Sequence, residues 1–345
     1  MSITKRAKQQ GLTIVELIVA LALGVVLVGG ITQVYLENKR NYVQDEAMAR
    51  LQENGRFAIN ILKRELKMTG FFGIGTDIDL LTVPSVSGGC AGSPTWALDF
   101  STAMDFVNDS AASPGASVRG VSFGGDCVQG GNVLAGTDII SIKRVADRET
   151  IVAGVYADGL VAGDEKKKRW YLQVEIDPAI GGTIMDNDFV YIDDSGFDAT
   201  ILTPANNLNL WLVQNRIFYV RDYSVTAGDG IPTLVMAMLA DNQFEQQPLV
   251  EGVEALHVEF GIPEANSQNG TPRRFVANPT AAELDSATVA RVYLLLRSRD
   301  PVNGYTDNKT YRLGSLPEID PADKRYMRRV FTTTVGIRNV DWLDI

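Results

Sequence analysis

The sequence predicts an α+β protein in which one long N-terminal helix packs on an antiparallel β-sheet within an enlarged globular head. Three observations predict this class. A segment of 20 residues without charge lies between Glu16 and Glu37, and an apolar stripe with helical spacing follows it. Beyond residue 70, short alternating runs are separated by Gly, Pro, Asn and Asp. With 345 residues and 45% hydrophobic content, the chain can bury a sizeable core.

The uncharged segment has the length of a membrane-spanning helix, because 20 residues cover about 30 Å. Positive charges precede it at Lys5, Arg6 and Lys8, whereas Glu37 offsets part of the positive charge behind it. We therefore expect a cytoplasmic N-terminus and an exported head. A secretory signal peptide is the alternative, but its apolar run would be shorter and would end in a small-x-small cleavage site.

The helix is expected to continue beyond the membrane and to dock one face on the head. The apolar stripe consists of Val43, Ala47, Leu51, Ala58, Leu62 and Leu66, with Arg50, Glu53, Asn60 and Lys63 on the other side. Gly70 follows Lys67 as a C-terminal stop. In the membrane half, Gly24, Gly29 and Gly30 would allow either close helix contact or local unwinding, although glycine is common in membrane helices.

The strands of the head are predicted from alternation and β-branched content. The candidates are residues 139–145, 171–176, 189–192, 216–220, 256–262, 290–296 and 331–337. In the strand around 256–262, His257 and Glu259 fall on the polar face. We expect these strands to form an antiparallel sheet packed on the helix.

The segment Gly11-Leu12-Thr13-Ile14-Val15-Glu16-Leu17 resembles the prepilin peptidase signature of type IV pilins, in which a basic leader ends in Gly and the fifth mature residue is Glu. The resemblance implies a type IV pilin-like fold. It also implies cleavage between Gly11 and Leu12, followed by methylation of the new amino terminus at Leu12.

Glu16 is costly at the edge of a lipid-buried helix unless it is paired, so a functional reason is the default. The free amine of Leu12 would lie four positions upstream on the same helix face, which makes an intrachain pair one reading. The other reading, implied by the family, is that Glu16 meets the amino terminus of a neighbouring subunit during filament assembly.

Three C-terminal stretches look like the PilW-type minor pilins. They are residues 249–254, residues 290–298, and residues 328–331 with Arg338 and Asn339. The region from about residue 76 to residue 247 carries no such resemblance and is where we expect this subunit to differ from its relatives.

The two cysteines, Cys90 and Cys127, both lie beyond the membrane segment. In an oxidising envelope compartment we expect them to form a disulfide, with two free thiols as the alternative. No CxxC motif or histidine cluster competes for them.

Residues suited to catalysis or cofactor binding are few, and we predict neither an enzyme nor a resident cofactor. His257, the lone histidine, is expected to be a solvent-facing or hydrogen-bonded strand residue. Clustered carboxylates can bind calcium, although the pattern here is not that of an EF-hand. This candidate metal site consists of Asp186, Asp188, Asp193, Asp194 and Asp198.

The formal charge of -10 argues against a general nucleic-acid footprint. One basic run, residues 166–169, could touch phosphate, but a four-residue cluster without interleaved aromatics is typical of a solvated hairpin end.

The sequence therefore predicts four parts: a leader (1–11), a transmembrane half-helix (12–36), an amphipathic half-helix (37–69) and a periplasmic or extracellular head (70–345). The resemblance implies a minor pilin that helps to prime pilus assembly from a position at or near the tip. The functions it implies for the pilus are twitching motility and adhesion. Its implied partners are prepilin peptidase, other minor pilins, the major pilin and a large tip adhesin. A pseudopilin of a type II secretion system and a membrane-tethered envelope enzyme or binding protein are the alternatives.

Overall fold

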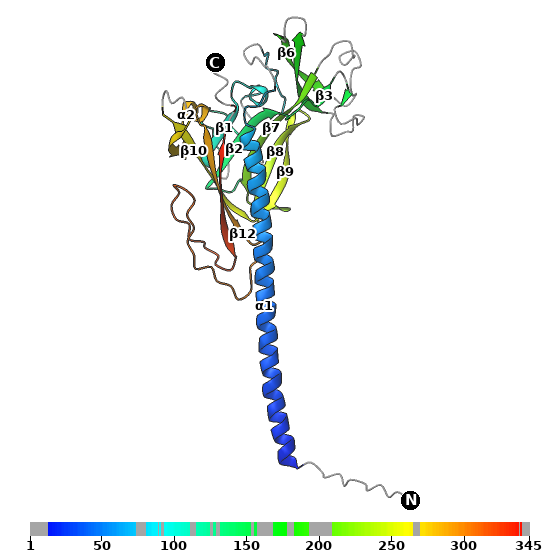
Figure 1. Cartoon of the computed structure of the whole chain (residues 1–345), viewed down its shortest axis with the longest axis vertical. Helices are drawn as coiled ribbons and strands as arrows, with labels where there is room; N and C mark the ends of the chain where they lie inside the picture. The colour runs from blue at the N-terminus through cyan, green and yellow to red at the C-terminus, as the bar shows by residue number, and fades with distance from the viewer. Residues whose placement is uncertain are drawn as a thin grey trace, which may run out of the picture.

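One helix, α1 (Ile14–Lys67), forms a stalk whose last third enters a β-rich head (Figure 1). The computed structural model describes residues 13–73, 81–88, 90, 93–110, 115–124, 127–128, 132–152, 155–156, 168–177, 183–192, 209–264, 270–337 and 339. Helix α1 ends where the sequence predicts, since Gly70 adopts a φ of 72° just beyond the last turn.

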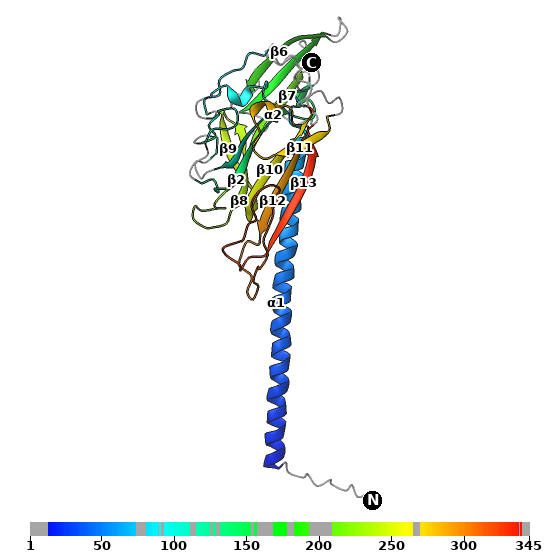
Figure 2. The same cartoon turned by 90° about the vertical axis from the view of Figure 1, so that its left-hand side faces the viewer.

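Two antiparallel sheets build the head (Figure 2). Within the described residues the larger sheet has nine strands. They are β1 (Met104–Ser110), β2 (Thr137–Val145), β3 (Ile151–Val152), β4 (Val155–Tyr156), β5 (Arg169–Asp177), β6 (Thr183–Ile192), β7 (Asn209–Arg221), β8 (Thr233–Ala240) and β9 (Gln243–Glu251).

The smaller sheet has the order β11-β10-β12-β13. Its strands are β10 (Val253–Pro263), β11 (Pro272–Val276), β12 (Val289–Arg297) and β13 (Arg328–Gly336). Two short helices complete the described elements: η2 (Trp96–Leu98), which is of the 3-10 type, and α2 (Ala281–Asp285).

The predicted α+β class is confirmed, and every predicted strand is present. Within the described residues, the predicted antiparallel sheet is divided into two. Several strands also escaped prediction. Among them, β8 is buried along almost its whole length, so its sequence shows no alternation to mark it as a strand.

The first hydrophobic core lies between α1 and the facing surfaces of both sheets. Helix α1 contributes Leu51, Ala58, Leu62 and Leu66, none of which is more than 2% exposed. The two sheets meet in the same core, where Phe106 of β1 and Phe260 of β10 pack edge to face with ring centroids 5.0 Å apart. The helix and both sheets therefore share one buried interior.

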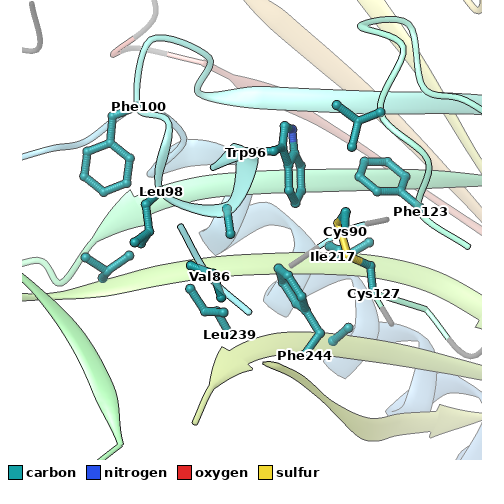
Figure 3. Close-up of a cluster of buried hydrophobic side chains, with 14 of the residues drawn as sticks. Val86, Cys90, Trp96, Leu98, Phe100, Phe123, Cys127, Ile217, Leu239 and Phe244 are labelled. Atoms are coloured by element: carbon teal, nitrogen blue, oxygen red, sulfur yellow. A yellow bond between two sulfur atoms is a disulfide. The ribbon is translucent and has the colours of Figure 1, made fainter. Parts of the chain in front are cut away.

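The second core covers the opposite face of the larger sheet (Figure 3). Trp96, Phe123 and Phe244 pack there around the disulfide between Cys90 and Cys127. The Cα atoms of the two cysteines are 5.1 Å apart, and 37 positions separate them in the sequence. The predicted pairing is confirmed, and it ties two loops of the head to the same apolar cluster.

Lys143 is buried on this same face of the larger sheet. Its Nζ donates hydrogen bonds to the carbonyl of Asp99 at 2.9 Å and to Oγ1 of Thr102 at 3.0 Å, and it lies 4.5 Å from the ring centroid of Trp96. Burial lowers the pKa of this amine to about 7. Lys143 thus holds the segment around η2 on the sheet at an electrostatic cost.

This cost predicts a pH dependence of stability. Between pH 7 and about 10.4 the unfolded chain keeps the Lys143 proton that the folded chain has lost, so the free energy of unfolding should rise with pH across this window. Lys143→Met should flatten that rise. Urea titrations of both proteins from pH 7 to pH 10 measure the slope, and an unchanged slope in the variant would contradict the assignment.

Gly55 of α1 lies directly against Phe331 of the smaller sheet. A Cβ atom at Gly55 would lie about 2.2 Å from the ring of Phe331 on β13. Real carbon atoms do not approach so closely, so the helix needs glycine at this position to seat the aromatic ring. By contrast, a Cβ at Gly29 would meet nothing within 4 Å.

This difference within one helix makes a matched pair of variants. Gly55→Ala should destabilise the head by about 1–3 kcal/mol through overpacking, whereas Gly29→Ala should leave the head unaffected. Chemical denaturation of the detergent-solubilised full chain, followed by tryptophan fluorescence, measures both. Equal stability of the two variants would show that Phe331 does not pack as described.

Candidate assembly site on the N-terminal helix

The first part of α1 projects from the head (Figure 1). Its apolar side chains are exposed. Ile14 is 78% exposed and Val26 is 74% exposed, and none of the membrane-length window of α1 is buried. Among the described residues, α1 is the one helix long and apolar enough to cross a membrane. Large apolar side chains exposed around a whole helix are typical of a segment that meets lipid or other helices.

Glu16 forms a capping box with Thr13 at the start of α1. Its Oε2 accepts hydrogen bonds from the backbone N–H of Thr13 at 3.0 Å and from the Thr13 hydroxyl at 2.8 Å. The Thr13 Oγ1 in turn accepts the backbone N–H of Glu16 at 3.3 Å. Gly11 and Leu12 lie outside the described residues, so cleavage, methylation and the pairing of Glu16 with an amine stay predictions.

The glycines of the membrane half are not required by contacts within the chain. Helix α1 continues without interruption through Gly24, Gly29 and Gly30, and a Cβ at any of them would meet nothing within 4 Å. Local unwinding is thus not seen here, and close contact with another helix stays a prediction.

Glu65, in the last turn of α1, is the buried anchor between the helix and the larger sheet. Arg144 of β2 donates two hydrogen bonds to Glu65, from Nε to Oε2 at 2.8 Å and from Nη2 to Oε1 at 3.0 Å. Nη1 of Arg216 on β7 donates to the same Oε1 atom. Glu65 and Arg144 are each only 3% exposed. Sequence reasoning missed this cluster, because Glu65 falls within the apolar stripe and its partners lie 79 and 151 positions away.

Removal of the Glu65 charge should leave two guanidinium groups with a neutral partner in a buried place. Glu65→Gln is therefore expected to cost about 3–5 kcal/mol, whereas Glu53→Gln, at an exposed position of the same helix, should cost little. Urea denaturation compares the two. If Glu65→Gln proves as mild as its control, the cluster does not anchor the helix.

A second ion cluster gathers at the end of the smaller sheet. Arg328 contacts Glu254 through Nε at 2.6 Å and Nη2 at 3.0 Å, and its Nη1 lies 3.4 Å from Asp307. Nη1 of Arg297 lies 3.5 Å from Oε1 of Glu254, and the Arg297 guanidinium stacks over the ring of Tyr326. The three stretches with a PilW-like sequence therefore converge at one place in the fold.

A cleft of about 370 Å³ separates the middle of α1 from residues 297–302. Val43 and Ala47 line it together with Arg50 and Glu251, so these two members of the predicted stripe do not dock in the core. Val43 is 43% exposed, and full burial begins only at Leu51. The predicted docking face was therefore too long at its membrane end.

His257 is fully buried, which excludes the solvent-facing alternative and leaves the hydrogen-bonded one. Its Nδ1 lies 3.0 Å from Oδ2 of Asp138, which also accepts the backbone N–H of Val258 at 2.8 Å. The face of β10 that looked polar is buried because residues 311–316 cover it, and Ser315 donates its backbone N–H to Glu259. His257 joins the smaller sheet to β2.

The structure describes only part of the acidic run of the candidate metal site and part of the basic run at residues 166–169. Asp188, on β6, accepts the backbone N–H of Phe189 at 2.7 Å. The side chain of Asp186 and the whole of Asp193, Asp194 and Asp198 lie outside the described residues. Within the described part of the chain, no three His, Cys, Asp or Glu residues gather as metal ligands.

In the basic run, Lys168 pairs with Asp241 at 3.3 Å, while Lys166 and Lys167 are not described. The calcium and phosphate hypotheses stay predictions.

Comparison with known proteins first defines the class of the N-terminal segment. Residues 6–32 match the family model of the prokaryotic N-terminal methylation motif, and this range contains Gly11, Leu12 and Glu16. The segment is therefore of the prepilin type.

The C-terminal part of the head then gives the more particular match. Residues 217–339 match the family model of type IV pilus-assembly protein W, which confirms the resemblance inferred from the sequence. Among solved structures, a type IV-like pilin from Thermus thermophilus aligns with 84% of this chain and 97% of its own, at 13% identity and a TM-score of 0.34. No curated protein matches the sequence.

Proposed function

We propose that this chain is a minor pilin of the PilW type that helps initiate type IV pilus assembly and enters the filament at or near its tip. The observation that carries the proposal is the exposed apolar stalk of α1, which starts with a single carboxylate directly after a prepilin-type leader. Such a helix lies in the membrane before assembly, and afterwards it packs among the equivalent helices of other subunits.

Processing comes first in the proposed sequence of events. Prepilin peptidase cuts the bond between Gly11 and Leu12 on the cytoplasmic side, and the new amino terminus is methylated. The mature protein is held in the inner membrane by one pass, with the head in the periplasm, and then moves to the cell surface within the filament. Other minor pilins, the major pilin and a tip adhesin are its partners.

Glu16 is proposed to act between subunits. Within its own chain its carboxylate accepts two hydrogen bonds from Thr13, which satisfies the cap, and no cation among the described residues pairs with it. The amine of an incoming subunit supplies that cation in a medium of low dielectric constant, where an unpaired charge is costly.

A type II secretion pseudopilin is the second candidate, because it would use the same leader, helix and Glu16. The match of residues 217–339 to the pilus-assembly family favours the pilus. The same match, with the pilin-type leader, supports a structural role over that of an envelope enzyme.

Two point variants test the assembly mechanism in a strain that lacks the wild-type chain. Glu16→Gln should be cut normally yet abolish most incorporation, since it cannot pair with the incoming amine. Thr13→Ala should retain incorporation, because it removes only the hydroxyl of the capping box. The mass of the membrane-bound protein reports cleavage, and immunoblots of sheared filaments report incorporation.

Normal incorporation of Glu16→Gln would contradict the intersubunit role. The deletion strain itself decides between the two systems: loss of surface pili and twitching supports the pilus, whereas loss of exoprotein release with normal pili would overturn it.

A further inference from the structure

Strand β13 forms one edge of the smaller sheet (Figure 2). It pairs with β12 over nine consecutive residue pairs, from Val289 with Gly336 to Arg297 with Arg328, without a shift in register. Helix α1 packs on one face of the strand, through the contact between Gly55 and Phe331. The other long side of the strand has no neighbouring strand among the described residues.

The hydrogen-bond pattern shows which backbone groups face this open side. At either end of the ladder, Ser298 donates its backbone N–H to the carbonyl of Met327, and Ile337 donates to the carbonyl of Thr288. Residues alternate along an antiparallel strand, so the odd-numbered residues of β13 face β12. The N–H and C=O groups of Val330, Thr332, Thr334 and Gly336 therefore point outward, and no described residue bonds to them.

Beyond Arg328 and Arg329, with which β13 begins, this edge lacks the protection that the other described edges carry. Strand β11 is short and holds Pro272 beside two arginines, and β9 contains Glu245 and Pro248. The pairings of β1 and β6 are broken by register shifts, and β4 has only two residues. Charges, prolines, bulges and shortness all prevent an edge from pairing with another chain.

The central part of β13, residues 330–335, reads Val-Phe-Thr-Thr-Thr-Val. It has high β propensity and contains no charge, proline or glycine. Thr332 and Thr334 are exposed. A long, regular and unprotected edge of this kind is a template for strand addition.

We propose that β13 is a docking edge that receives an extended strand from a different subunit of the same filament. The proposal rests on the assembly function proposed above and names how this head would join a neighbour. The added strand extends the smaller sheet beyond β13, and its backbone bonds to the outward groups of Thr332 and Thr334.

A second copy of this chain fits the edge poorly. Strand β13 runs lengthwise beside α1 (Figures 1 and 2), so antiparallel pairing of two β13 strands would point the two α1 helices in opposite directions. Helices anchored in one membrane cannot do this. If two copies paired in parallel about a two-fold axis, each outward-pointing residue of β13 would lie opposite the same residue of the other copy. In a parallel ladder, however, a residue whose N–H and C=O groups face the partner strand lies opposite a residue whose groups face away. The two requirements conflict.

The surroundings of β13 define the chemistry of the incoming strand. On the face that packs against α1, Phe331 and Val335 lie beside the position of the added strand, which favours apolar side chains on that face of the strand. On the other face, Thr332 and Thr334 are exposed, which favours polar or β-branched side chains. The incoming strand should alternate apolar and polar residues, without proline at the positions whose N–H faces β13.

Hydrogen exchange on the full chain tests the edge while the partner is still unidentified. In detergent alone, the amides of Thr332 and Thr334 should exchange rapidly while those of Phe331 and Thr333 are protected, because only the latter bond to β12. In sheared filaments all four should be protected. Protection of Thr332 and Thr334 in the isolated chain would show that its own residues cover the edge and would overturn the proposal.

A matched pair of variants isolates the backbone group. Thr332→Pro and Thr332→Val both lose the hydroxyl, but only the proline removes the outward N–H, and neither removes a bond to β12. Thr332→Pro should lose most incorporation into filaments, and Thr332→Val should not. Equal incorporation of the two variants would refute strand addition. Thr334→Pro with Thr334→Val repeats the comparison if Thr332→Pro does not reach the membrane folded.

A photo-reactive benzoylphenylalanine at residue 334 identifies the neighbour, with residue 225 as an exposed control position outside the edge. The expected cross-linked peptide is an alternating segment of another protein with a prepilin-type leader. A cross-link to residue 334 of a second copy, or to this chain's own residues, would overturn the proposal. If the deletion strain remains fully piliated, the proposed function itself fails, whereas failure of the edge experiments alone leaves that function standing.

Discussion

The shared burial of Glu65 between two guanidinium groups is the constraint on which the architecture depends. A carboxylate in the last turn of a long helix is held by strands β2 and β7, so the helix cannot rotate or slide without exposing three charges to an apolar core. The first core then packs on either side of this fixed point. Because the anchor lies near the end of α1, the opposite end is free to extend far from the head.

One helix consequently serves two environments. Its last third is buried on one face only, with Leu51 and Leu62 in the core and charged residues outside. Its first part is apolar all round, and the described residues bury none of its membrane-length window. Between them lies the cleft beside residues 297–302, where the helix has left the head but not yet reached the apolar segment. At the cleft, the surroundings of the continuous helix change from the protein core to solvent.

Local features were predictable from the sequence because their causes are local. Charge distribution and helical spacing predicted α1 and its stop at Gly70, and alternation predicted most strands. The pairing of Cys90 with Cys127 followed from the compartment and the lack of competitors. What escaped prediction depends on contacts between distant segments.

Which strands pack together is not encoded by any periodicity in the sequence. Three features depend on it: the cluster at Glu65, the burial of His257 and the division into two sheets. His257 illustrates the limit: its strand alternates as though one face were wet, yet residues 311–316 cover that face. The predictions at Gly11 and Leu12 depend on a short motif alone, and the match of residues 6–32 supports the motif.

The capping box at the start of α1 also bears on proteolysis. Thr13 is extended, with ψ at 149°, and its bonds to Glu16 fix the first helical residue at Ile14. Peptidases bind backbone that can be drawn out as an extended chain, and a helix that ran back through residue 12 would hide the bond to be cut. The same carboxylate proposed to recruit the next subunit therefore also fixes the start of the helix at Ile14, beyond the predicted cleavage site.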